Sequence, residues 1–195
     1  IPSDANPKNN QIFFVYGEPG DLGGTVVASD AIAGPILQFC AGDFQRDPPK
    51  MASLRTSWSA DTRSWENQTL LLWQESLPEP EMAEALESFA REGGVVLFLP
   101  PPEPGSASFL DTTWGEIEEA SPTDPFKVAR WDQISGPLAD TDEGLGLPFD
   151  TLDTYRRRTL AGYESVVASF QDGSPFLARK TVGQGAVYFL ATLPR

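Results

Sequence analysis

The sequence of 195 residues contains no histidine, one cysteine and two methionines, and it has half as many basic as acidic side chains. Without histidine, neither a Ser-His nor a Cys-His catalytic pair can form, and no imidazole can bind a metal. A single cysteine excludes an internal disulfide and a four-cysteine zinc site. No run reaches the length of about 18 apolar residues that a transmembrane helix needs. These absences exclude several common enzyme classes before any motif is considered.

Basic residues are scarce, and the formal net charge is −14. Because phosphate contacts need a basic surface, nucleic-acid binding is not expected. The net charge is −8 over residues 1–100, −10 over residues 101–153 and +4 over residues 154–195. The middle segment is either a solvated acidic surface or a docking face for a basic partner. The run Arg156-Arg157-Arg158 either pairs with these acids within the chain or faces solvent.

Apolar residues make up 40% of the sequence and aromatic residues 11%, which is enough for a packed core. The run Ile12–Tyr16 is apolar throughout and rich in β-formers, as expected for a strand buried on both faces. Asp30 is placed to cap a helix over residues 31–44, although Pro35 favours a later start. A second strand is predicted over residues 51–58.

The clearest unit of the sequence runs from Gln68 to Pro100. It begins with the apolar run Thr69–Trp73 and continues with a proline-initiated helix that has apolar residues about every 3.6 positions. Gly93 is placed to end that helix in the left-handed conformation, and Val95–Leu99 forms the next apolar run. A strand, a helix and a strand with short joints predict a right-handed parallel crossover.

The later part of the chain has weaker patterns. Trp114–Glu119 suggests a short helix, and Gly183-Gln184-Gly185 suggests a hairpin turn. Strands are predicted over Phe126–Trp131, Val166–Phe170, Phe176–Val182 and Ala186–Ala191. The predicted fold class is therefore α/β, with one domain over residues 1–195, a mostly parallel sheet flanked by helices, and an antiparallel C-terminal hairpin.

Two motifs close to the C-terminus resemble a known family. Ser169–Pro175 reads SFQDGSP and Val182–Val187 reads VGQGAV, and both follow an opening strand and the strand–helix–strand unit in the same order. They resemble the ending of class I glutamine-amidotransferase-like domains. In particular, they resemble the extracytoplasmic domains of bacterial membrane proteins of the aerotolerance (Bat) type, which have an N-terminal double-transmembrane region. The resemblance implies a flavodoxin-like three-layer sandwich.

Catalytic members of that family place a cysteine nucleophile after the strand that corresponds to Val95–Leu99, together with a histidine and a glutamate. Here that position is Leu99 or Pro100, within the run Phe98-Leu99-Pro100-Pro101-Pro102, which contains no nucleophile. The prolines also preclude the usual turn into a helix. We therefore expect a non-catalytic domain without cofactor or metal.

The resemblance also implies a location. The chain begins at Ile1 without an initiator methionine or a signal peptide, which suggests a piece of a longer protein, and the resemblance implies that this protein is membrane-anchored. By resemblance alone, the domain is expected on the extracytoplasmic face of a bacterial cytoplasmic membrane, in the periplasm.

Asn67-Gln68-Thr69 matches a glycosylation motif, but it begins an apolar strand and is interpreted as chance.

Other candidate sites have simpler structural interpretations. Cys40 lies beside Leu37 on the apolar stripe of a predicted helix, so we expect it to be buried and inert. The loop Gly17–Gly24 follows the first strand, but it matches no phosphate-binding motif and carries two acids. The spacing Asp140-x-Asp142-x-Gly144 starts like an EF-hand, yet Thr151 stands where a glutamate is required. A looser site of acids and carbonyls for a divalent cation remains an open alternative.

Three functional hypotheses follow. The first is a non-catalytic interaction or scaffolding domain that binds a protein partner. The second is a carbohydrate- or small-ligand-binding domain, in which Trp58, Trp114 and Trp131 would surround a cleft. The third is a hydrolase that uses a carboxylate pair. Its candidates are Asp140, Asp142, Glu143, Asp150 and Asp153. The predicted interaction surface comprises Asp140, Asp142, Glu143, Trp114 and Trp131.

Overall fold

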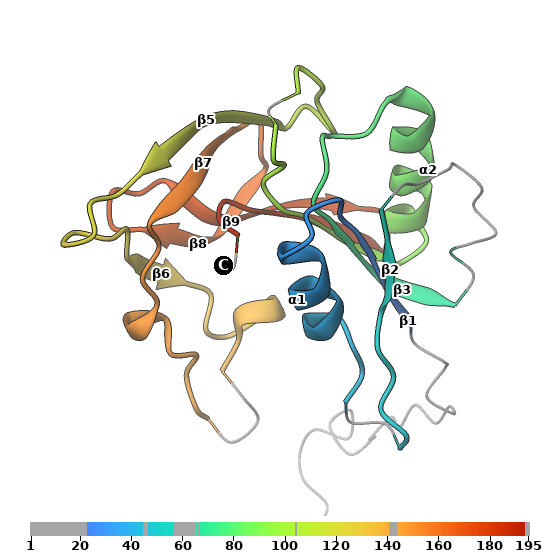
Figure 1. Cartoon of the computed structure of the whole chain (residues 1–195), viewed down its shortest axis with the longest axis horizontal. Helices are drawn as coiled ribbons and strands as arrows, with labels where there is room; N and C mark the ends of the chain where they lie inside the picture. The colour runs from blue at the N-terminus through green and yellow to red at the C-terminus, as the bar shows by residue number, and fades with distance from the viewer. Residues whose placement is uncertain are drawn as a thin grey trace, which may run out of the picture.

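The computed structural model describes residues 23–44, 47–56, 65, 67–103, 105–140 and 144–193. They form a mixed α/β fold around an eight-stranded sheet with the order β2-β1-β3-β4-β10-β9-β8-β6 (Figure 1). Its strands are β1 (Gly23–Val27), β2 (Ser53–Arg55), β3 (Gln68–Trp73), β4 (Val95–Phe98), β6 (Val128–Trp131), β8 (Ser165–Phe170), β9 (Pro175–Val182) and β10 (Gly185–Leu190). The other elements are β5 (Thr113–Glu119), β7 (Arg156–Ala161), α1 (Ala33–Cys40), α2 (Pro80–Arg91) and the short 3₁₀ helices η3 (Gly136–Leu138) and η4 (Phe149–Thr151).

The main sheet is parallel on one side and antiparallel on the other. Strands β2, β1, β3, β4 and β10 pair in parallel, and β9, β8 and β6 extend the sheet with antiparallel pairs. The tight turn between β9 and β10 contains Gly183 at φ +58°. The expected α/β class, the mostly parallel sheet and the antiparallel C-terminal hairpin are therefore confirmed.

The strand–helix–strand unit has the predicted form. β3 and β4 are parallel neighbours, and α2 connects them with Pro80 as its first residue. Gly93 adopts φ +111°, the left-handed conformation predicted for it. At Gly94, a Cβ atom would lie 2.3 Å from the Phe89 ring, so glycine allows the helix to pack closely on the following strand.

The N-terminal part differs from the prediction. The expected strand Ile12–Tyr16 lies outside the described residues, as does most of the predicted glycine loop. Gly23 and Gly24, which end that loop in the sequence, belong to β1 instead. A Cβ on Gly24 would lie 2.5 Å from the carbonyl oxygen of Ala41, so the strand passes too close to the chain after α1 to carry a side chain there. The strand predicted over residues 51–58 is observed as the three residues of β2.

Helix α1 is shorter than predicted, and it exposes Cys40, which was expected to be buried. The Asp30 carboxylate accepts hydrogen bonds from the backbone N–H groups of Ile32 and Ala33 at 2.8 and 2.9 Å, as expected for a capping residue. Leu37 is buried, but Cys40 is exposed. The prediction of a buried cysteine is therefore wrong, because α1 has apolar residues on both faces and the sequence cannot tell which face packs inward.

Both faces of β4 are buried, which explains its continuous apolar run. Val96 and Phe98 belong to a core cluster that includes residues of α2, whereas Leu97 and Leu99 pack with a second cluster that includes residues of α1. A third cluster contains Phe170 and other residues of the antiparallel side of the sheet. The apolar runs therefore predicted buried strands correctly.

One element of the acidic segment differs in type from the prediction. Trp114–Glu119, expected as a short helix, lies in β5, which pairs antiparallel with β7 in a separate two-stranded sheet. Trp114 is buried while its neighbours are partly exposed, which is an alternation typical of a strand. The run is too short to distinguish the two periods in sequence, and its partner strand lies about 40 residues further along the chain.

No helix within the described ranges is long and apolar enough to span a membrane. The longer of the two α-helices has 12 residues.

Candidate functional site

Open parallel sheets place their functional groups beyond the carboxyl ends of the strands, so this edge is the first candidate site. β3 is followed there by Gln74, whose side chain is completely buried and donates from Nε2 to the Pro100 carbonyl oxygen at 3.4 Å. β4 continues there into Leu99, Pro100 and Pro101, which are all buried. Backbone and proline rings therefore occupy the position where the family resemblance would place a nucleophile.

Arg158 of β7 closes this edge from the other side. Its guanidinium donates to the carbonyl oxygens of Gly115, Pro101 and Pro102 at 3.2, 3.3 and 3.5 Å. Its backbone N–H donates to the carbonyl oxygen of Ala191, just after β10, at 2.8 Å. Burial, followed by repulsion from Arg156, lowers the pKa of Arg158. A guanidinium held by carbonyl oxygens fixes the proline loop and offers neither a base nor a nucleophile.

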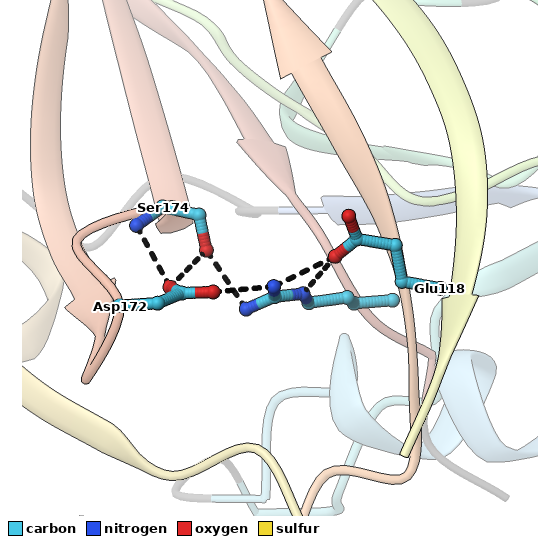
Figure 2. A network of polar contacts seen from close by, with 4 residues as sticks. Glu118, Asp172 and Ser174 are labelled. Atoms are coloured by element: carbon cyan, nitrogen blue, oxygen red, sulfur yellow. Dashed lines mark hydrogen bonds and ion pairs between the residues drawn. The ribbon is translucent and has the colours of Figure 1, made fainter.

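The densest polar cluster surrounds Arg157, the neighbouring residue on β7 (Figure 2). Its Nε donates to Glu118 of β5 at 2.7 Å, and its Nη2 lies 2.5 Å from Asp172 and 2.7 Å from the same glutamate. Its Nη1 donates to the Ser174 hydroxyl at 2.8 Å. In Figure 2, Glu118 lies on one side of the guanidinium, and Asp172 with Ser174 lies on the other. We call these four residues the Arg157 cluster.

Aromatic rings also contact the Arg157 guanidinium. The guanidinium carbon lies 3.8 Å from the ring centre of Phe126 and 4.8 Å from that of Phe170. Arg157 is only 7% exposed. Cation–π contacts of this kind strengthen when water is excluded. The side chain thus combines two ion pairs with packing against two rings.

The hydrogen bonds and ion pairs of the Arg157 cluster stabilise the charged forms of Arg157 and Asp172. Burial opposes the charge of Arg157, but the bonds to Asp172 and Glu118 outweigh it and raise the pKa of the guanidinium. The bond from Arg157, followed by that from the Ser174 hydroxyl, holds the pKa of Asp172 far below its usual range. Both carboxylates are bound to one cation. Because its pKa is lowered, Asp172 stays ionised at neutral pH and lacks the raised pKa that a general acid requires.

The Arg157 cluster explains the SFQDGSP motif. Asp172 accepts from the Ser174 N–H at 3.0 Å and from its hydroxyl at 2.6 Å, which shapes the turn between β8 and β9. Gly173 in this turn adopts φ +85°. The same carboxylate then binds Arg157 and so joins the turn to the β5–β7 sheet. The motif residue Asp172 thus has a structural role here.

The sequence anticipated this cluster only in part. The alternative in which the arginine run pairs with the acidic segment is observed for Arg157 with Glu118 and for Arg156 with Glu119, the latter at 3.7 Å. The burial of Arg157 and the role of Asp172 were missed. The available signal was a run of three arginines that follows a segment with a net charge of −10.

The residues predicted as an interaction surface do not all share one face. Asp140 is exposed, whereas Asp142 and Glu143 lie outside the described residues. Trp114 is 8% exposed and packs edge-on against Phe189 in the core, with ring centres 6.0 Å apart. Trp131 is partly buried, and its ring centre lies 4.9 Å from that of Phe149. Trp114 is therefore unavailable as a flat surface for a ligand.

The remaining acidic candidates are Asp150 and Asp153. Asp153 forms an ion pair with Lys127, and the side chain of Asp150 lies outside the described set. Within the described ranges, no group of three or more acidic or cysteine side chains could hold a metal ion. The EF-hand-like spacing at Asp140 includes residues that are not described.

The described surface has two hollows on or beside α2, of about 580 and 320 Å³. The larger lies on the helix itself and is lined by Glu81, Glu84, Ala85, Glu87, Ser88 and Arg91. The smaller lies between the end of α2 and β9, and Lys180 and Asp111 line it. Neither hollow is lined by an aromatic residue, and the glutamates of the larger one all lie on one helix. This arrangement lacks the opposed carboxylates of a glycosidase.

Comparisons with known proteins show a shared fold and no family. No family model matches the sequence, and no curated protein matches it. Gan42B, a GH42 β-galactosidase from G. stearothermophilus, matches 91% of this chain with a TM-score of 0.54 and 12% identity. The N-terminal domain of mmIFT52 matches 87% of this chain, and 85% of its own length, with a TM-score of 0.50 and 15% identity.

This chain covers only a minor part of the length of the two β-galactosidases. This chain spans 28% of the length of Gan42B and 21% of the β-galactosidase from Bacillus circulans sp. alkalophilus, which matches with a TM-score of 0.45 and 17% identity over 67% of this chain. At such identities, only the fold is shared. This chain accordingly has a mixed α/β fold that occurs as one part of a GH42 β-galactosidase and as the N-terminal domain of mmIFT52.

Proposed function

We propose that this chain is a non-catalytic binding module. One observation carries the proposal: the carboxyl edge of the parallel strands, where related folds place their chemistry, is filled by Pro100 and Pro101 and fastened by Arg158. The absence of histidine from the whole sequence supports it. So does the Arg157 cluster, in which both carboxylates serve as ion-pair partners.

In this proposal, the chain is a degenerate glutamine-amidotransferase-like domain with a flavodoxin-like, three-layer arrangement. It acts as an interaction domain on the extracytoplasmic side of a bacterial membrane, within a longer anchored protein. The support is the SFQDGSP and VGQGAV motifs and the burial of both faces of β4.

Carbohydrate binding is the second candidate. The observation that favours it is the similarity in fold to part of the β-galactosidase Gan42B. The burial of Trp114 weighs against it, because a sugar platform needs an exposed ring. A hydrolase using a carboxylate pair is a third and weaker candidate, since the glutamates that line the larger hollow all lie on one helix and are not opposed.

Activity assays and calorimetry on one purified sample test the three candidates. We expect no release of ammonia from glutamine, no hydrolysis of nitrophenyl β-galactoside or β-mannoside, and no heat on titration with galactose or manno-oligosaccharides. Glutaminase or glycosidase activity that persists in Cys40→Ala and is lost on substitution of one carboxylate would show an enzyme. Saturable binding of one sugar would favour the second candidate.

A further inference from the structure

The outward face of α1 is apolar and exposed. Ile32, at the start of the helix, is 71% exposed, and Phe39, in its last turn, is 60% exposed. Cys40 is exposed beside it. The helix sequence AGPILQFC contains no charged residue, and its inward residues already pack on the sheet. The helix therefore offers an apolar face to solvent with no charge among its own residues, although Asp30 and Asp43 lie before and after it.

The exposed face continues beyond the helix. Phe44 is 45% exposed and its ring centre lies 4.6 Å from that of Phe39. We call Ile32, Phe39, Cys40 and Phe44 the α1 patch. With aromatic side chains of about 150–250 Å² each, the exposed apolar area is on the order of 400 Å². Patches of this size on a folded domain commonly mark an interaction site.

We propose that the α1 patch binds the same patch of a second copy of this chain, with the two α1 helices antiparallel across a two-fold axis. Ile32 and Phe39 are seven positions apart, which places them on one side of the helix and about 10 Å apart along it. A two-fold axis at their midpoint sets Ile32 against Phe39 of the partner subunit, and the reverse contact forms by symmetry. The patch is thus complementary to itself.

Charge favours this surface over others for self-association. Each copy carries a net charge of −14, so contact through most of the surface would bring acids together. An uncharged helix avoids that repulsion, and antiparallel helix dipoles attract one another. The inference goes beyond the proposed function, because it does not depend on what else the chain binds.

The expected strength of the dimer follows from its area. Two patches together bury on the order of 800 Å² of apolar surface, which with a polar rim reaches the lower end of specific interfaces, near 1,200 Å². We therefore expect a reversible dimer with a dissociation constant in the micromolar range, roughly 1–100 μM. Because the remaining surface is acidic, the dimer should strengthen as salt screens that charge.

Sedimentation velocity and thiol labelling test the proposal on the purified chain. Cys40 is the sole cysteine and lies in the patch, so Ellman's reagent reports burial of the patch directly. The mass should rise towards that of a dimer between about 1 and 200 μM, and labelling should slow several-fold over the same range. The double variant Ile32→Ser, Phe39→Ser should stay monomeric and label at one rate throughout. Both side chains are largely exposed, so its thermal unfolding should match that of the parent.

A matched control is Ile134→Ser, which changes an isoleucine that is 94% exposed outside the α1 patch. It should dimerise like the parent. A parent chain that remains monomeric at all concentrations, with a constant labelling rate, would overturn the proposal. A dimer that persists in the double variant would also overturn it, because another surface would then form the dimer. Loss of the dimer in the Ile134→Ser control would overturn it for the same reason. Enzymatic activity would contradict the proposed function and leave this inference intact.

Discussion

Arg157 and Arg158 are adjacent on β7, both nearly buried, and held in opposite ways. Successive side chains of a strand point to opposite faces, so the two guanidiniums enter different surroundings. Arg157 binds two carboxylates and packs against two rings, and its pKa is raised. Arg158 binds carbonyl oxygens, and its pKa is lowered by burial.

The difference separates two structural tasks. Carboxylates come from β5 and from the turn between β8 and β9, so Arg157 joins two sheets through charge. Two of the three carbonyl oxygens that Arg158 binds belong to Pro101 and Pro102 of the proline loop. The side chains of these prolines cannot accept a hydrogen bond, so Arg158 binds the loop through its backbone. A buried cation with neutral partners gains less from its contacts, and its removal should cost less.

Replacing Arg157 should have the largest effect. Arg157→Ala leaves Glu118 and Asp172 without their cation and removes the packing against Phe126. Because both carboxylates are about half exposed, we expect a loss of about 2–4 kcal/mol in the free energy of unfolding, mainly from the lost hydrogen bonds to charged groups. Urea unfolding followed by tryptophan fluorescence measures it. Arg157→Lys is the matched control, because it keeps the charge and loses the forked geometry. Its free energy of unfolding should lie between those of the parent and Arg157→Ala. If Arg157→Ala lost less free energy of unfolding than Arg158→Met, the proposed difference between the two arginines would be wrong.

Replacing Arg158 should have a smaller effect. Arg158→Met retains much of the buried volume but leaves the carbonyl oxygens of Pro101 and Pro102 without a donor, for an expected loss of about 1–3 kcal/mol. The same urea titration measures it. The loop over residues 100–103 should become accessible to a protease in native buffer. Unchanged protection of this loop would show that Arg158 does not fasten it.

Removing the charge of Asp172 should have a moderate, pH-dependent effect. Its carboxylate side chain is about half exposed, so Asp172→Asn should cost only about 1 kcal/mol at pH 7. The folded-state pKa is depressed, so the stabilisation is present above the unfolded-state pKa, near 3.9, and is lost as pH falls through the folded value. The parent and the variant should therefore differ above pH 5 and converge as the solution is acidified. A difference independent of pH would exclude the charge as its cause.

The ion pair between Arg156 and Glu119 should contribute least to the free energy of unfolding. The Glu119 side chain is 72% exposed and lies 3.7 Å from Arg156. Glu119→Gln should therefore change the free energy of unfolding by less than about 0.5 kcal/mol, and less still in high salt. Glu118→Gln on the same strand, facing Arg157, is the matched comparison and should cost more in the same titration.

Local patterns predicted the elements that depend on local physics. The β3–α2–β4 unit was predicted nearly to its ends, because the helix period, Pro80 and Gly93 all lie within one short segment. β5 was mistaken for a helix, since its strand character depends on pairing with β7. The exposed Cys40 was missed because both faces of α1 are apolar, and only the position of the sheet decides between them.

Composition alone determined that this chain has no histidine-based chemistry and no internal disulfide, because those depend only on which side chains exist. The tertiary structure decided which charges are buried together. Glu118 and Asp172 lie 39 and 15 residues from Arg157, and neither separation corresponds to a helix or strand period. Such contacts form only when packing brings distant strands side by side, and only then does burial make an ion pair strong enough to matter.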